Sequence, residues 1–286
     1  MRSRAEILLV VVTFFWGATF VVVKLALADA SPLVFIAARF LVAGGLLFLV
    51  IGRHRPDPRA LRPSLVLGVV LFGGYALQTW GQEYTTASKC AFITAFSVIL
   101  VPVILALMGM PLSGASVGGA LLGLMGIYLL VAPSGLSSVN RGDVLSLGGA
   151  VAFALYIVLV GRYSRDYSYQ DLAPAQILLI GVIACAGLPL PHNWRVNWTA
   201  GLVTAIAVTA VFSTAFAFAV QNWAQRYVPP AHAALIFALE PVFAALTSYV
   251  VVKERLGGKV LLGSALILAG MVVSEMWGNR RDVAAV

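Results

Sequence analysis

The stretch Trp80-Gly81-Gln82-Glu83-Tyr84 recurs 143 residues later as Trp223-Ala224-Gln225-Arg226-Tyr227. Each copy ends a long apolar run and is followed by a short turn and another apolar run. A recurrence at the same place in two series of apolar segments indicates an internal duplication. We therefore expect the chain to consist of two related halves.

A proline follows within the next apolar run of each copy, Pro102 in the first and Pro241 in the second. These prolines lie 139 residues apart, so the pattern predicts four extra residues before the proline of the first copy. The split between the halves is expected in the Pro- and Ser-containing segment after the fifth apolar run. The predicted repeats are residues 1–135 and 136–286.

Composition assigns the chain to the membrane. Its 286 residues are 61% hydrophobic and 10% charged, against about 45–50% apolar and about 25% charged in soluble domains. At about 20 apolar residues per crossing, the chain holds about ten spans joined by short connections. The expected spans lie near 6–27, 33–52, 64–83, 88–109, 114–132, 143–162, 172–190, 199–224, 230–252 and 260–277. The sequence thus predicts an all-α integral membrane protein of ten transmembrane helices.

Five helices in each half is an odd number, so the second half must enter the membrane from the opposite side. Inverted repeats around a central cavity permit two states of similar energy, one open to each side of the membrane. That is the architecture of a carrier that works by alternating access. An intramembrane enzyme or receptor has no comparable need for the duplication, and the inverted halves disfavour a channel, the third hypothesis.

The basic residues predict the orientation. With a cytoplasmic N-terminus, 11 of the 19 Lys and Arg residues fall on the cytoplasmic side, including the cluster at 53–62. Both termini are therefore expected in the cytoplasm. The expected location is the inner (plasma) membrane. The net charge of +8 is interpreted as topology signals and lipid contacts, with no nucleic-acid partner. We interpret the first apolar run as a permanent helix, since it is long for a signal peptide and carries Lys24.

Four segments of this chain resemble the EamA-type branch of the drug/metabolite transporter superfamily. They are FWGATF at 15–20 with Lys24, AARF at 37–40, YTTASKCAFI at 84–93, and LEPVFAAL at 239–246 with Lys253 and Glu254. The resemblance implies an exporter of small metabolites, with the fifth and tenth helices peripheral and the other eight around a central cavity. It is closer to exporters of aromatic and other amino acids than to the sugar-nucleotide branch.

Two polar stripes mark candidate cavity walls. The third span carries Tyr75, Gln78, Thr79 and Gln82, and the eighth carries Thr214, Phe218, Gln221 and Gln225. Each set falls on one helical face, and the two stripes correspond in the repeat. The alternative is interhelical hydrogen bonding that only holds the bundle together, at about 0.6–2 kcal/mol per contact.

The chemistry of these stripes suits a zwitterion. Amides and hydroxyls bind an ammonium or a carboxylate without bringing net charge into the bilayer. Aromatic residues are available to surround an apolar side chain, with ordinary aromatic packing as the alternative. The candidate substrate-binding residues are Trp16, Thr19, Arg39, Tyr75, Gln78, Thr79, Gln82, Phe92, Phe96, Tyr156, Thr214, Phe218, Gln221 and Glu240.

Lys24 and Arg39 are the cations assigned to the membrane interior, and Glu240 is the carboxylate predicted near the middle of a span, where an isolated charge is costly. Lys24 either reaches the outer headgroups or contacts protein. Arg39 is expected to contact backbone carbonyls as part of a gate, or a substrate carboxylate. Glu240 directly precedes Pro241, which cannot donate to the helical ladder. This carboxylate is either a site for a proton or a substrate ammonium, or a structural acceptor.

No cofactor or metal is expected, because the two cysteines and three histidines lack ligand spacing. The chain has no phosphate-cradling loop, so we expect a secondary carrier rather than an ATP-driven pump. No nucleophile elbow or zinc-protease motif supports the alternative hypothesis, an intramembrane enzyme acting on lipid. The expected partners are a small-molecule substrate and membrane lipid. Pairs of small residues, Gly119/Gly123 and Ala265/Ala269, fit internal packing or a weak dimer of an otherwise monomeric protein.

Overall fold

The computed structural model describes residues 1–51, 54–111, 113–132, 134–189 and 194–278, and this part of the chain is helical with no strand. Residues 1–135 contain α1 (Arg2–Ala26), α2 (Pro32–Ile51), η1 (Pro58–Ala60), α3 (Leu61–Tyr84), α4 (Ala87–Ala95), α5 (Ser97–Leu107) and α6 (Gly114–Val131). Residues 136–286 contain η2 (Leu136–Ser138), α7 (Arg141–Tyr163), α8 (Tyr169–Gly187), α9 (Ala200–Ala210), η3 (Val211–Phe216), α10 (Ala217–Ala224), α11 (Pro230–Phe237), α12 (Glu240–Val252) and α13 (Gly258–Gly278). The prediction of an all-helical chain is confirmed.

Nine helical segments of the described chain are long and apolar enough to cross a membrane, and they run from 18 to 27 residues. A shorter apolar stretch, Gly258–Ser274, follows them within α13. Each predicted run overlaps one of these segments or α13. At 1.5 Å per residue even the 18-residue segment is about 27 Å long, close to the hydrocarbon thickness of a bilayer.

Two of the spans are interrupted near their middle. The span from Ala87 to Leu107 breaks at Phe96 between α4 and α5, and the span from Pro230 to Val252 breaks between α11 and α12. The first residues of α4 and α11 are 143 residues apart, and so are those of α5 and α12. This is the spacing of the repeated tryptophan segment.

The expectation of four extra residues in the first copy is therefore wrong, because the helix starts keep a constant spacing and only the prolines do not. Pro102 lies inside α5, several residues past the break, whereas Pro241 lies in the first turn of α12. Proline is well tolerated in the first helical turn, where the missing N–H has no helical partner. The prolines alone were thus a poor guide to the positions of the breaks.

A π-helical segment, η3, joins α9 to α10 within one span. Its hydroxyl groups bond to the widened turn: Thr214 Oγ1 donates to the carbonyl of Thr209 at 2.8 Å, and Ser213 Oγ donates to the same oxygen at 3.1 Å. Segments of this kind are rare and recur at functional sites. Nothing in the apolar pattern of residues 199–224 predicted it.

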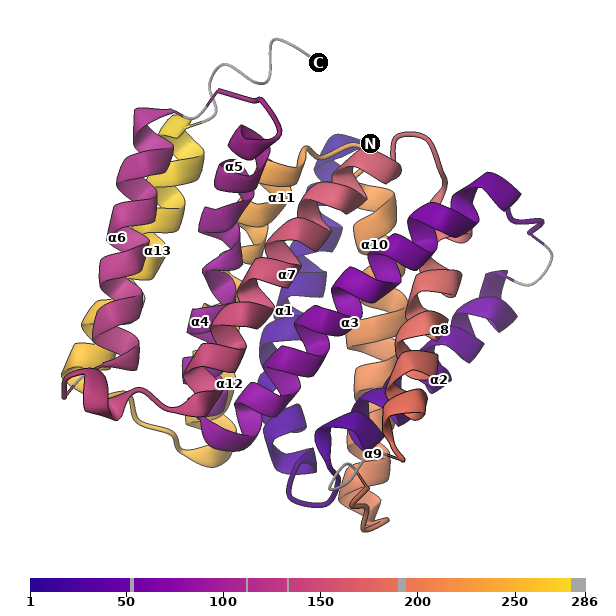
Figure 1. The fold of residues 1–286 in the computed structure, drawn as a ribbon, viewed down its shortest axis with the longest axis horizontal. Coiled ribbons are helices and arrows are strands. Elements are labelled where there is room, and N and C mark those ends of the chain that lie inside the picture. Colours follow the sequence, from indigo (N-terminus) through magenta and orange to yellow (C-terminus); the bar gives the residue numbers. More distant parts are fainter. Residues whose placement is uncertain (52–53, 112, 133, 190–193, 279–286) are drawn as a thin grey trace.

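The helices form a bundle with one pair set apart at its edge. In Figure 1, α6 and α13 run side by side at the left of the view, and these two helices contact each other. In the rest of the bundle, α3 packs against α7 and α8, α2 against α8, and α1 against α12. The edge position of α6 and α13 agrees with the peripheral fifth and tenth helices that the resemblance implied.

Glycines bring α6 and α13 into close contact. A Cβ added at Gly126 would lie 2.6 Å from the carbonyl oxygen of Gly263, and one added at Gly263 would lie 2.6 Å from that of Gly126. Gly119 faces the carbonyl of Gly270 in the same way. The small residues of α6 therefore serve internal packing, whereas Ala265 on α13 is exposed.

The described ends of the chain lie at the same edge of the bundle. In Figure 1 the start of α1 and the end of α13 both lie at the top.

Candidate substrate-binding cavity

A cavity with about 630 Å³ of empty space lies inside the bundle. This volume includes open space at the mouth of the cavity, so the room for a bound ligand is smaller. The residues expected from the sequence that line it are Trp16, Thr19, Arg39, Tyr75, Gln78, Gln82, Tyr156, Phe218, Gln221 and Glu240. Further lining residues are Phe20, Val23, Leu71, Thr94, Ser97, Phe153, Ile157 and Phe237.

Aromatic rings form much of the wall. The ring of Phe218 lies 5.6 Å from Trp16, 6.0 Å from Tyr75 and 5.8 Å from Tyr156, measured between centroids. The indole of Trp16 also lies 5.2 Å from the ring of Phe237. These rings come from α1, α3, α7, α10 and α11, so residues of both halves of the chain line the same cavity.

The guanidinium of Arg39 is buried at one end of this aromatic wall. Its Nε donates to Thr214 Oγ1 at 2.7 Å, and its Nη2 donates to the carbonyl of Ser213 at 3.2 Å. It also lies 4.9 Å from the ring centroid of Tyr75 and 5.2 Å from that of Phe40. The expected contact of Arg39 with backbone carbonyls is therefore present, and its partner is the π-helical segment.

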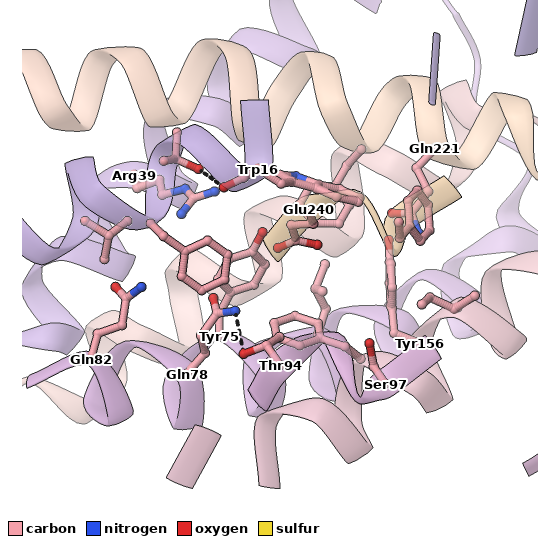
Figure 2. Close-up of a pocket in the computed structure, with 18 residues that line it drawn as sticks. Trp16, Arg39, Tyr75, Gln78, Gln82, Thr94, Ser97, Tyr156, Gln221 and Glu240 are labelled. Atoms are coloured by element: carbon pink, nitrogen blue, oxygen red, sulfur yellow. Dashed lines mark hydrogen bonds between the residues drawn. The ribbon is translucent and has the colours of Figure 1, made fainter. Parts of the chain in front are cut away.

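The same carbonyl also receives the indole of Trp16. Trp16 Nε1 donates to Ser213 O at 3.0 Å, so α1 and α2 are both fixed to η3 through one oxygen. The π-helical turn presents this oxygen toward α1 and α2. Figure 2 shows Arg39 and Trp16 side by side at this end of the cavity.

The hydroxyl of Tyr156 is engaged by polar side chains of the second half. It donates to Gln176 Oε1 at 2.9 Å, and Gln176 Nε2 donates to Asn222 Oδ1 at 3.2 Å. Asn222 in turn donates to the carbonyl of Phe218 at 2.7 Å. What Tyr156 presents to the cavity is therefore its ring, held in place by a buried hydrogen-bond chain.

The glutamines of the two stripes differ in their contacts. Gln221 Nε2 donates to Gln225 Oε1 at 3.0 Å, and Gln225 Nε2 donates to the carbonyl of Ile157 at 3.0 Å. In the first half, Gln78 Nε2 donates to Thr94 Oγ1 at 3.3 Å. The side chain of Gln82, the counterpart of Gln225, has no hydrogen bond within the described chain, although this residue is only 2% exposed.

The carboxylate of Glu240 points into the centre of the cavity. Glu240 begins α12 at the break in its span. The sequence predicted this position beside a helix interruption. Figure 2 shows its two oxygens facing the space between Trp16 and Tyr75. Within the described chain these oxygens have neither a hydrogen bond nor an ion pair, and half-burial leaves them open to the cavity.

Ser97 is the counterpart of Glu240 in the first half. It begins α5 at the equivalent break, and it lines the same cavity. Sequence reasoning did not identify Ser97, because the prolines gave the wrong alignment of the two spans. At the 143-residue spacing, the two residues correspond directly.

Four of the expected site residues do not line the cavity. Phe92 and Phe96 belong to the apolar core next to α6, and a Cβ at Gly123 would lie 3.1 Å from the ring of Phe96. Thr79 is buried on α3 outside the lining. Thr214 lies behind Arg39 and holds it. A helical stripe has a width of several residues, so its edges face neighbouring helices.

Lys24 contacts protein at the end of α3. Its Nζ donates to the carbonyl of Gln82 at 2.5 Å, and it lies 3.4 Å from the carbonyl of Glu83. The last four carbonyls of a helix have no helical partner, and a cation near them is stabilising. Lys24 therefore joins α1 to the end of α3 instead of reaching for headgroups.

No group of three or more His, Cys, Asp and Glu side chains in the described ranges could hold a metal ion. Both cysteines are free thiols. The chemistry at the cavity is thus that of one carboxylate, one guanidinium, amides, hydroxyls and aromatic rings. Such a set can bind and orient a small polar molecule.

Comparison with known proteins identifies the family. The EamA-like transporter family matches residues 3–132 and again residues 140–276. A protein of Archaeoglobus fulgidus named as an uncharacterized transporter is 35% identical over 277 residues, covering 96% of this chain and 87% of that protein. A protein of Escherichia coli named as the uncharacterized inner membrane transporter YedA is 26% identical over 263 residues, covering 90% of this chain and 84% of YedA.

The fold agrees with a solved structure. A solved crystal structure superposes with a TM-score of 0.73 at 19% identity, covering 98% of this chain and 99% of that one. The family and the names of the relatives point to transport of small molecules within the membrane rather than to catalysis. With two matches that together span most of its length, the chain is a multi-pass membrane transporter and belongs to the EamA-like transporter family.

Proposed function

We propose that this protein is a secondary transporter that exports small metabolites, with amino acids bearing aromatic or apolar side chains as its substrates. The observation that carries the proposal is the cavity, in which an unpaired carboxylate and several amides face a wall of aromatic rings. Polar groups of this kind bind the charged end of an amino acid, and the rings of Trp16, Phe218 and Phe237 surround its side chain.

The transport cycle is alternating access between two inverted five-helix halves, residues 1–135 and 136–286. Two separate family matches support the duplication, as does the constant 143-residue spacing of the starts of α4 and α11 and of α5 and α12. Counting α13 as the tenth span gives each half five crossings, and an odd number makes the halves inverted. The cavity lies where helices of both halves meet, which is the place for a site that is exposed alternately to each side.

The proposed orientation has both termini in the cytoplasm and the protein in the inner membrane. The excess of Lys and Arg in the segments assigned to the cytoplasm supports the orientation. The described ends of the chain at one edge of the bundle are consistent with it. The name of the Escherichia coli relative, an inner membrane transporter, supports the location in the inner membrane.

Individual cavity residues have proposed roles. Glu240 binds the substrate ammonium, and the amides of Gln78 and Gln82 bind either charged end. The rings of Trp16, Tyr75, Tyr156 and Phe218 contact the side chain, while Thr19 and Gln221 complete the polar lining. Arg39 with Thr214 holds the π-helical segment against α1 and α2.

Counterflow in proteoliposomes tests the function. Vesicles loaded with an unlabelled amino acid should take up the same labelled amino acid faster than empty vesicles, with a rate that saturates. A channel would show neither saturation nor counterflow. The second candidate, an intramembrane enzyme acting on lipid, would instead change the lipid composition of the vesicles, which mass spectrometry detects. Protein-free liposomes provide the control.

A further inference from the structure

Among the described residues that line the cavity, the only carboxylate is that of Glu240. Carboxylates inside membrane proteins are normally paired with a cation or bonded to backbone groups. This one has no partner in the described chain, and it points into the cavity (Figure 2). The missing partner of such a group is a cation or a proton.

The one cation of the described lining, Arg39, is already engaged. Its Nε and Nη2 hold Thr214 and Ser213, and rings lie near its guanidinium plane. Nη2 also lies 3.5 Å from Ser213 Oγ, so Nη1 is the nitrogen left for a ligand. Arginine selects carboxylates through two parallel N–H···O bonds, and a single remaining nitrogen cannot provide that pair. Arg39 is therefore a poor receptor for a substrate carboxylate.

The surroundings of Glu240 also favour a cation. The faces of aromatic rings attract ammonium groups, and Trp16 and Tyr75 lie on either side of the carboxylate in Figure 2. The side chain of Gln82 also lines the cavity, and its buried amide oxygen has no hydrogen-bond partner among the described residues. An amide oxygen accepts a hydrogen bond from an ammonium group.

We infer that the cavity recognises a protonated amine attached to an aromatic or apolar body, and that the substrate carboxylate is dispensable. Simple amines are then substrates alongside the corresponding amino acids. This inference rests on the proposed function, because it names the part of the amino acid that the carrier recognises.

The test compares molecules that share one body and differ only in their charged groups. Tyrosine carries both groups, tyramine only the ammonium, and 3-(4-hydroxyphenyl)propionate only the carboxylate. Leucine, isopentylamine and 4-methylpentanoate form an aliphatic series. Each is added to proteoliposomes during counterflow of the labelled amino acid, and each is also loaded inside to measure stimulation of uptake. Protein-free liposomes correct for the passive leak of the neutral amines.

The half-inhibitory concentration of the amine should lie within about threefold of that of the unlabelled amino acid. Amine loaded inside the vesicles should also stimulate uptake of the labelled amino acid. The carboxylate-only molecule should be more than about tenfold weaker, since losing one partner of a desolvated charge pair commonly costs a factor of at least that size. Glu240→Gln should lower the affinity for the amine by about tenfold or more. Its matched control is Glu83→Gln, which removes a carboxylate of α3 that does not line the cavity and should leave the affinity unchanged.

The outcomes separate the two proposals. Amino-acid counterflow with competition by the carboxylate-only molecule and none by the amine overturns the inference and leaves the proposed function intact. Amine counterflow without amino-acid counterflow supports the inference and overturns the amino-acid assignment. The absence of any counterflow with both series rejects both. The comparison in the unmodified protein decides the matter even if Glu240→Gln fails to fold.

Discussion

The indole of Trp16 and the guanidinium of Arg39 donate to one backbone oxygen, that of Ser213. Trp16 comes from α1, Arg39 from α2, and the oxygen from the π-helical segment of the eighth span. A regular α-helical turn would use that oxygen for its own ladder. The widened turn thus connects three spans at one point beside the cavity.

We predict that Arg39→Lys lowers the transport rate by about tenfold and lowers thermal stability, because lysine lacks the planar fork that reaches Thr214 and Ser213 together. Initial rates normalised to folded protein, with melting measured in detergent, check this result. Arg165→Lys, at an exposed position, is the matched control and should behave as the unmodified protein. Wild-type rate and stability in Arg39→Lys would show that the contact to η3 is dispensable.

We predict that Gln78→Ala and Gln221→Ala lower transport more than they lower protein abundance, because both side chains line the cavity. Gln221→Ala should also lower stability, since Gln221 bonds to Gln225. Thr79→Ala, a change on α3 outside the cavity lining, is the control and should keep substrate affinity. Near-normal uptake in both cavity variants would assign the pair to bundle packing.

We predict that Glu240→Gln abolishes the response to an imposed pH gradient, while exchange of substrate down its own gradient continues at raised substrate concentration. Glutamine keeps the size of glutamate but cannot carry a proton. Uptake into vesicles with and without a pH difference provides the measurement. If the carboxylate were only structural, the variant would lose thermal stability and the remaining protein would keep its response to pH. An unchanged variant would leave a facilitator driven by substrate concentration alone.

We predict that a cysteine in place of Asp57 does not react with an impermeant reagent added outside intact cells, because the basic cluster at 53–62 is expected in the cytoplasm. A cysteine in place of Trp198, which is 64% exposed in the connection before α9, should react. The native cysteines set the background signal. The reverse pattern would invert the proposed orientation.

We predict that Gly119→Ala destabilises the protein by about 1–3 kcal/mol, because its methyl group would meet the carbonyl of Gly270 and the Cβ of Ser274. Gly118→Ala is a control one residue away, where an added Cβ meets nothing within 4 Å. That change should be neutral or stabilise by about 0.5–1 kcal/mol, because alanine favours a helix interior over glycine. Similar melting temperatures for both variants would show that α6 and α13 separate more easily than their contact indicates.

The sequence predicted the spans because apolar runs of bilayer length have few alternative structures. It predicted much of the cavity from polar stripes, since lipid penalises polar side chains on an outer face. The π-helical segment was not predictable, because the contacts of Ser213 with Arg39 and Trp16 depend on tertiary packing. Ser97 was missed for a different reason, since its role follows from the position of a helix break that its neighbouring proline does not mark.

Ser97 and Glu240 begin equivalent helices but differ in charge. In the proposed inverted repeat, exchanging the two halves exchanges the two facing states. The state open to the cytoplasm and the state open to the outside therefore do not present the same groups to a ligand. The half-saturation constants measured from the two sides should therefore differ. For a carrier coupled to no other gradient the net flux at equal concentrations is still zero, so the difference appears only in these kinetic constants.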